Sequence, residues 1–145
     1  MSGIWTFTIA RGGPNPHEGC VSRVSFQFYP QGIGSMNKQH DPVDFHQQTA
    51  PALIMSERGL DYATGGGYME KADGTKIYPE DSAEIGDVVY INPQTPHGVE
   101  RIDGAETDWV SFRGRWTMLF AITKLGANQA VSNSVDLENT RLKSA

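Results

Sequence analysis

The chain is poor in cysteine, because Cys20 is the only cysteine among its 145 residues. A single thiol excludes an internal disulfide and a metal cluster built from several cysteines. Apolar runs are also short and nowhere approach the roughly 18 uninterrupted residues of a membrane span. Residues 1–11 lack the basic and apolar segments of a secretion signal. We therefore expect a cytoplasmic protein from a reducing compartment that has no membrane partner.

Positive charge is scarce as well. Twelve lysines and arginines stand against seventeen aspartates and glutamates, which gives a formal net charge of −5 and a sequence pI near 5.3. A nucleic-acid partner is not expected, since such proteins carry a basic surface. The length predicts one domain over residues 1–145, in which 1–20 form an N-terminal arm and strand. Residues 126–145 are predicted to form a polar C-terminal tail in which a short helix is possible.

Helical periodicity is scarce too, whereas short runs rich in Val, Ile, Phe, Tyr and Trp recur between turn signals. This pattern predicts an all-β fold, a sandwich or a small barrel. The expected strands are Ile4–Ile9, Val21–Tyr29, Pro42–Gln48, Ala52–Ser56, Asp61–Glu70, Thr75–Tyr78, Asp87–Asn92, Gly98–Ile102, Asp108–Phe112 and Trp116–Thr123.

Two of these strands carry predictions about burial. In Val21–Tyr29 the apolar residues Val24, Phe26 and Phe28 alternate with polar ones, so we expect this face to point into the core. The segment 88–91 is apolar without alternation, which predicts a strand covered on both faces.

Glycine, present sixteen times, marks the expected corners. Asp73-Gly74 predicts a hairpin with a type I′ turn, in which both central residues have positive φ. The three consecutive glycines at 65–67 predict a bend or a bulge.

Two of the four histidines are informative by position. His97 follows a strand and a Pro-flanked turn, which would fix its imidazole at the edge of a β barrel. Asp44, His46 and Gln48 alternate onto one face of an expected strand. His40 shares that face if the strand continues without a bulge, and His17 lies in a loop. Imidazoles gathered in one pocket favour a borderline transition metal such as zinc or iron.

The stretch Gly86–His97 opens with Gly-Asp before a strand and closes with Thr-Pro-His. It resembles the second conserved motif of the cupin superfamily, in which the closing histidine is a metal ligand. The segment from Gly34 to Gly59 contains His40 and His46 and stands where the first cupin motif would lie. The resemblance covers about residues 20–112.

The first cupin motif usually supplies His-x-His followed by a glutamate, and two registers remain open here. If His40 is the first histidine, Pro42 takes the second position and His46 replaces the glutamate. If His46 is the first, Gln48 is the second and Ala52 replaces the glutamate. Either register predicts a metal site without a carboxylate, whose ion would act as a strong Lewis acid toward a carbonyl oxygen.

The resemblance implies a double-stranded β-helix, the jelly-roll fold of cupins, and a homodimer joined through Ile4–Ile9. Within the superfamily, the chain is similar to the cupin-type aromatic polyketide cyclases of the resistomycin pathway kind. That similarity implies a metal-dependent enzyme of antibiotic biosynthesis, with zinc first and iron as the alternative. The expected reaction is aldol-type cyclisation and aromatisation of a polyketide, and the similarity also brings His17 into the ligand set.

Three alternatives on the same scaffold remain open: a non-haem Fe(II) dioxygenase, a small-molecule isomerase and a non-catalytic ligand-binding cupin. The expected metal ligands are His17, His40, His46 and His97. Asp44, as general base or as the partner that orients an imidazole, and Gln48 are the expected catalytic residues.

The abundant aromatic residues predict an apolar cavity suited to an aromatic or polyketide substrate, lined by those that face inward. The candidates are Trp5, Phe7, Phe26, Phe28, Phe45, Tyr90, Trp109, Phe112, Trp116 and Phe120. Arg23, Arg113 and Arg115 could bind an anionic substrate, but we expect them at the solvent-exposed surface.

Overall fold

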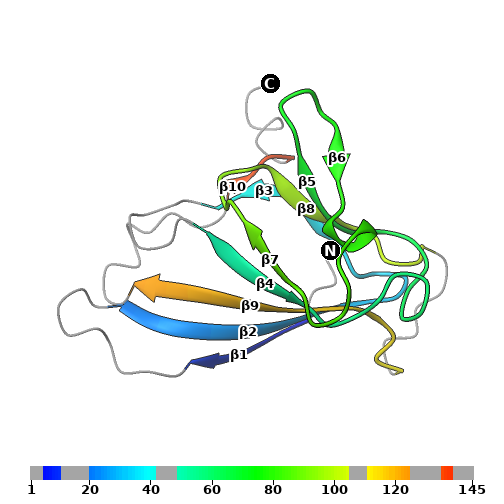
Figure 1. Ribbon diagram of the computed structural model, residues 1–145, viewed down its shortest axis with the longest axis horizontal. Coiled ribbons are helices and arrows are strands. Elements are labelled where there is room, and N and C mark those ends of the chain that lie inside the picture. The colour runs from blue at the N-terminus through cyan, green and yellow to red at the C-terminus, as the bar shows by residue number, and fades with distance from the viewer. Residues whose placement is uncertain (1–4, 11–19, 42–48, 105–110, 125–134, 139–145) are drawn as a thin grey trace.

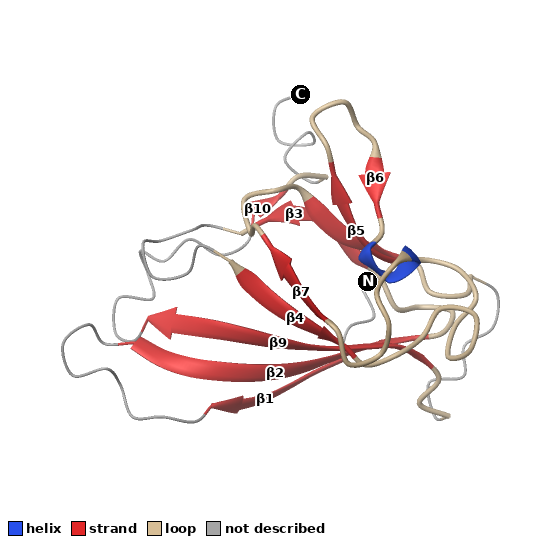
Figure 2. Ribbon diagram, in the orientation of Figure 1, coloured by secondary structure: helices blue, strands red, loops and turns tan. Residues whose placement is uncertain are grey.

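The computed structural model describes residues 5–10, 20–41, 49–104, 111–124 and 135–138. They form ten strands and one single-turn 3₁₀ helix, η1, shown in blue in Figure 2. The elements are β1 (Trp5–Ala10), β2 (Cys20–Pro30), β3 (Met36–His40), β4 (Ala50–Ile54), β5 (Gly66–Glu70), β6 (Lys76–Ile77), η1 (Pro79–Asp81), β7 (Val88–Ile91), β8 (His97–Glu100), β9 (Gly114–Lys124) and β10 (Val135–Asp136).

The strands form two five-stranded antiparallel sheets, so the predicted all-β class is confirmed. The first sheet has the order β1-β2-β9-β4-β7 and the second the order β10-β3-β8-β5-β6. In Figure 1 the first sheet fans across the lower half of the molecule and the second lies above it. The longest pairing joins β2 to β9, from Cys20 opposite Lys124 to Pro30 opposite Gly114. In the part of the chain described, no helix is long and apolar enough to cross a membrane.

Several element boundaries differ from the prediction. β3 and β10 were not predicted as strands, and β10 extends the second sheet from within the expected polar tail. Only residues 66–70 of the expected strand Asp61–Glu70 are extended in β5, since residues 60–64 form turns and bends around Tyr62, which makes an isolated bridge to Arg58. The whole of the expected strand Pro42–Gln48 lies outside the described residues. Of Asp108–Phe112 only residues 111–112 are described, and they form a turn.

The predicted inward face of β2 is wrong. Gln27 and Tyr29 line the cavity between the sheets, so strand alternation places Phe28 on the opposite side of the first sheet. Phe28 is buried there by stacking on Trp116, with ring centroids 4.3 Å apart, and by Phe112 at 6.0 Å. The polar positions of the alternation therefore face inward, because the interior here is a cavity and not a close-packed apolar core.

The segment Val88–Ile91 is not covered on both faces, as its unbroken apolar run had suggested. It is β7, the last strand in the order of the first sheet, where Val88 is 42% and Tyr90 69% exposed. β1 ends the same sheet at its other edge. An edge is the place from which a strand can pair with a second copy, and that pairing stays a prediction.

The hairpin at Asp73-Gly74 is confirmed between β5 and β6, but its turn type differs from the prediction. Gly74 has φ +85, whereas Asp73 is not among the described residues with positive φ. The Gly74 amide donates to the Lys71 carbonyl at 2.9 Å, and the Lys71 amide donates to Thr75. This pattern indicates a type I turn followed by a glycine bulge, which needs only one residue in the left-handed region.

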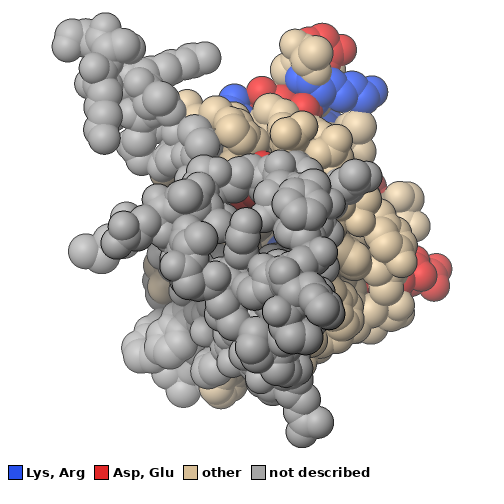
Figure 3. Space-filling model, turned by 90° about the vertical axis from the view of Figure 1, so that its left-hand side faces the viewer, with Lys and Arg blue, Asp and Glu red and all other residues tan. Residues whose placement is uncertain are grey.

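The packed part of the interior is a cluster of buried residues. It consists of Tyr29, Tyr62, Val99 and Ile102, and Met36 packs against it. Two ion pairs join residues of the second sheet: Lys38 pairs with Glu70 and Lys76 with Glu100. Figure 3 shows charges of both signs side by side at the top of the molecule.

Candidate functional site

A cavity of about 320 Å³ lies between the two sheets. The first sheet contributes Gln27, Tyr29, Ala50, Ala52, Ile91, Arg115, Thr117, Leu119 and Phe120 to its lining; the second contributes Met36, Gln39, Gly67, Tyr68, Met69, His97, Gly98 and Val99; Asp41, Pro79 and Pro93 complete it. Most of these side chains are apolar, and the polar ones gather at two places. Such a cavity suits a small organic ligand with few polar groups.

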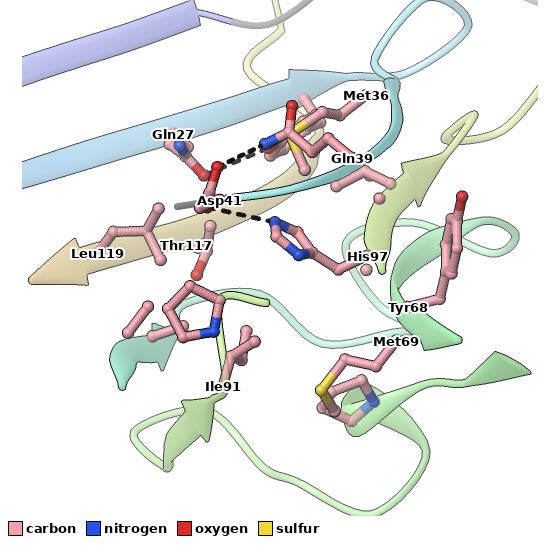
Figure 4. A pocket seen from close by; sticks show the side chains of 18 of the residues that line it. Gln27, Met36, Gln39, Asp41, Tyr68, Met69, Ile91, His97, Thr117 and Leu119 are labelled. Atoms are coloured by element: carbon pink, nitrogen blue, oxygen red, sulfur yellow. Dashed lines mark hydrogen bonds and ion pairs between the residues drawn. The ribbon is translucent and has the colours of Figure 1, made fainter. Parts of the chain in front are cut away.

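His97 and Asp41 form the first polar group of the cavity. The ring nitrogen Nδ1 of His97 lies 2.9 Å from the Thr95 carbonyl oxygen, and Nε2 lies 3.5 Å from Oδ2 of Asp41. Figure 4 shows the Asp41 carboxylate between the side chains of Gln39 and His97. A carbonyl oxygen only accepts hydrogen bonds, so Nδ1 carries a hydrogen and Nε2 of the neutral ring is the basic nitrogen.

The surroundings of His97 raise its pKa above the ordinary value of 6.5. Burial lowers this pKa, but the hydrogen bonds to Asp41 and Thr95 and the charge of Asp41 outweigh the burial. The His97 side chain is 13% exposed and that of Asp41 36%, so the imidazole is largely buried while solvent partly screens the carboxylate. The imidazole is therefore a base whose protonated form is stabilised inside the cavity.

The amide of Gln39 contacts the same carboxylate. Nε2 of Gln39 donates to Oδ1 of Asp41 at 3.4 Å, and Gln27 lines the adjacent wall. Tyr29 donates its hydroxyl to Oε1 of Gln27 at 3.2 Å. Burial raises the pKa of Tyr29 to about 12, although Arg115 opposes this rise. Tyr29 is thus a hydrogen-bond donor at any physiological pH.

Arg115 forms the second polar group, in contrast to the solvent-exposed position expected for it. Nε lies 2.7 Å and Nη2 2.6 Å from Oε1 of Glu80, whose side chain is only 3% exposed. Burial lowers the pKa of Arg115, and the nearby Glu80 carboxylate more than restores it. Arg113, two residues earlier, is exposed as expected.

The predicted site residues have different positions. His97 lines the cavity. His40 does not, because Gln39 and Asp41 line it and alternation turns His40 to the other face of β3. The structure thus does not bring His40 and His97 together. The remaining predicted residues, His17, Asp44, His46 and Gln48, lie outside the described residues.

Asp41 is the main residue that the sequence analysis missed, since Asp44 was the carboxylate expected near the imidazoles; whether a metal site here lacks a carboxylate ligand stays a prediction. The polar segment Met36–His40 was not recognised as a strand, so nothing in the sequence indicated which of its neighbours face inward. Strand parity, with Gln39 and Asp41 alternating around His40, is the signal that would have found it once β3 was known.

The aromatic lining also differs from the prediction. Of the ten expected aromatic residues, Phe26, Phe28, Tyr90, Phe112, Trp116 and Phe120 have described side chains, and Phe120 alone among these six lines the cavity. Tyr29 and Tyr68, which were not named, line it instead.

The described residues do not by themselves form a metal site. Among them, no three His, Cys, Asp or Glu side chains are placed to hold a metal ion. Nε2 of His97 and the Asp41 carboxylate are two suitable donors that face each other, whereas protein zinc sites use three or four protein ligands.

Comparison with known proteins leaves the family open. No protein-family model, no curated protein and no solved structure matches this chain.

Proposed function

We propose that the protein is an enzyme that acts on a small carbonyl compound in the cavity, with His97 and Asp41 as its acid–base pair. The orientation of the imidazole carries this proposal. Thr95 holds the Nδ1 side of the ring, Nε2 lies 3.5 Å from the Asp41 carboxylate, and both His97 and Asp41 line the cavity. A base held in this way accepts a proton without reorientation, and its conjugate acid is stabilised at once.

The proposed reaction is an aldol-type ring closure. Nε2 of His97 removes a proton from the carbon next to a ketone, and the C–H electron pair becomes the C=C bond of an enolate. The enolate carbon then bonds to a second carbonyl carbon of the same molecule. The oxygen of that carbonyl takes the proton back from Nε2, so the histidine is regenerated. Loss of water from the ring aromatises the product.

The size of the cavity narrows the substrate. A volume of about 320 Å³ is close to the lower limit of small-molecule sites, which span roughly 300–1,000 Å³. We therefore propose a polyketide intermediate of one or two rings rather than a large polycyclic one.

We also propose that the fold is the jelly roll of the cupins. Strands β2 to β9 support this proposal, because they alternate between the two sheets except at the β5–β6 hairpin. The resulting orders, β2-β9-β4-β7 and β3-β8-β5-β6, are those of two interleaved antiparallel Greek keys.

A metal-dependent form of the same reaction is the second candidate. It is favoured by the bond from Nδ1 to a backbone carbonyl, the usual arrangement of a histidine that binds a metal through Nε2. His97 and Asp41 would hold the ion, with His17 and His46 as proposed further ligands. Zinc, or iron as the alternative, would supply a Lewis acid for the ketone.

The test of the acid–base proposal is hydrogen exchange next to a ketone. In D₂O, NMR would follow loss of the CH₂ signal beside the ketone in a panel of aryl ketones, including 4-oxo-4-phenylbutanoate and its methyl ester. We expect the protein to accelerate exchange and His97→Gln to reduce the rate by about 100-fold or more, as is typical for loss of a general base.

His40→Gln is the matched control, since His40 does not line the cavity, and it should leave the rate unchanged. Absence of acceleration across the panel, or equal rates in wild type and His97→Gln, would contradict the proposal. Elemental analysis of the same samples separates the two candidates: full exchange by metal-free protein would contradict the metal-dependent form.

A further inference from the structure

We propose that Arg115 anchors a carboxylate of the substrate, so that the ligand of this cavity is a keto acid. This inference rests on the proposed function, because it assumes that the ketone of the same molecule reaches His97. It adds the chemical class of the substrate and a residue that determines specificity.

The first observation is the position of Arg115 in the cavity wall. Its side chain is nine-tenths buried, with 10% exposed, and it lines the cavity from β9. A Cβ placed on Gly67 would lie 2.6 Å from Nη2, so the guanidinium crosses the interior and rests on the backbone of β5. The absence of a side chain at Gly67 leaves the space that the guanidinium occupies.

The second observation is the use of the guanidinium donors. A guanidinium has five N–H donors. Nε and Nη2 of Arg115 both approach the same oxygen, Oε1 of Glu80, while Nη1 makes no hydrogen bond with the described residues. Part of the donor set is thus committed, and part is left for an acceptor from the cavity.

The third observation is the location of the counter-charge. Glu80 does not line the cavity; it lines a separate pocket together with Glu57 and Glu84. The Glu80 carboxylate therefore lies on the side of Arg115 that faces away from the cavity. It holds the guanidinium in place, and the positive charge of Arg115 is the charge that faces the cavity. The ring of Tyr29, 5.3 Å from Cζ, fixes it from the side.

The spacing along the second sheet fits a short keto acid. Gly67, which Arg115 contacts, pairs with Val99, and Met69 pairs with His97. Two residues along a strand span about 7 Å. A ligand with a carboxylate at one end and a ketone a few bonds away can reach both groups.

The experiment compares 4-oxo-4-phenylbutanoate with its methyl ester, which lacks the anionic group. Their dissociation constants are measured by isothermal titration calorimetry. We expect the acid to bind wild type at least roughly tenfold more tightly than the ester, because only the acid can form a charged hydrogen bond with the guanidinium of Arg115. Equal affinity of the two in wild type would overturn the proposal.

Two variants test whether Arg115 is the source of the preference for the acid over its ester. Removing Arg115 alone would leave a buried Glu80 charge without its partner, so the double variant Arg115→Met with Glu80→Gln removes both charges together. We expect it to bind acid and ester within about twofold of each other, whereas the exposed control Arg113→Met keeps the wild-type ratio. A preference that survives in the double variant, with its fold verified by circular dichroism, would overturn the proposal.

Arg115→Lys covers the case in which the double variant fails to fold. It keeps the charge but lacks the planar donor fork, and should reduce the preference severalfold; an unchanged ratio would count against the anchor. The two proposals fail separately. If the acid binds more tightly than the ester but His97→Gln exchanges as fast as wild type, only the Arg115 anchor is supported. If acid and ester bind equally but His97→Gln slows exchange, only the acid–base pair is supported.

Discussion

Asp103 illustrates how one carboxylate fixes a loop. Its Oδ1 accepts the backbone amides of Ala63 and Thr64 at 2.8 and 2.7 Å, and its Oδ2 accepts Nε2 of Gln31 at 2.8 Å. The residue itself has φ +44, a left-handed conformation that Asp tolerates better than most residues. The turns at 60–64, which interrupt the predicted strand, are thereby tied to the end of β2.

We predict that Asp103→Asn lowers the free energy of unfolding at pH 7 by about 1–3 kcal/mol, because an amide nitrogen would face a donor. Asp73→Asn is the control. The Asp73 carboxylate accepts a hydrogen bond from the amide of Thr75 in an exposed turn, so this variant should lose less unfolding free energy. Urea unfolding measures both. Equal stability of Asp103→Asn and wild type would contradict the assignment.

The pH dependence of this effect follows from the pKa of Asp103. Burial raises it, but the hydrogen bonds from Thr64, Ala63 and Gln31 outweigh burial and lower it below 3.8. The folded pKa is thus below the unfolded one, so the stabilisation is present above pH 3.8 and is lost as the pH falls through the folded pKa. The difference in free energy of unfolding between Asp103→Asn and wild type should therefore become smaller at acidic pH.

Two glycines show which turns depend on space as well as on φ. Gly65, before β5, and Gly74, in the β5–β6 hairpin, have nearly equal φ angles of +86 and +85. A Cβ at Gly65 would lie 2.2 Å from the Arg101 carbonyl oxygen, whereas a Cβ at Gly74 would have no atom within 4 Å.

We predict that Gly74→Ala costs about 1–2 kcal/mol of unfolding free energy through backbone strain alone. Gly65→Ala introduces the same strain and must also displace the strand that ends at Glu100. It should therefore lower the free energy of unfolding clearly more than Gly74→Ala does. Thermal and urea unfolding of the two variants provide the comparison. A loss of equal size in both would mean that the approach of Arg101 to Gly65 is not tight.

At the level of elements, local sequence predicted the strands with strong β residues and missed those defined by their partners. β2 and β9 are rich in branched and aromatic residues, and both were found. β3 reads Met-Asn-Lys-Gln-His and is extended because β8 and β10 pair with it, which no local pattern reveals. The prediction assigned the two faces of β2 the wrong way round. The rule of alternation assumes that the apolar face points into a dry core, whereas here Gln27 and Tyr29 face a cavity.

At the level of the whole molecule, the candidate site was only partly predictable. His97 was found from its place after a strand and a proline turn, and the structure places it in the cavity. Its partner Asp41 and the pair Arg115–Glu80 come from segments far apart in the chain, which meet only when the two sheets face each other. The histidines and the resemblance indicated a metal site, and that part stays a proposal.

The His97–Asp41 pair also couples stability to pH. Because the folded pKa of His97 is raised, the pair stabilises the folded state fully below pH 6.5. This stabilisation is lost as the pH rises through the folded pKa. The same pKa sets the pH at which Nε2 becomes a base for the proposed reaction.

The most direct test of the central claim is the titration of the His97 ring, followed by NMR in wild type and in Asp41→Asn. The signal is assigned by its absence in His97→Gln. We predict a midpoint above 6.5 in wild type and a lower one in Asp41→Asn, since the variant keeps the burial and loses the carboxylate. A wild-type midpoint at or below 6.5, or one that Asp41→Asn leaves unchanged, would contradict the assignment of His97 and Asp41 as the acid–base pair.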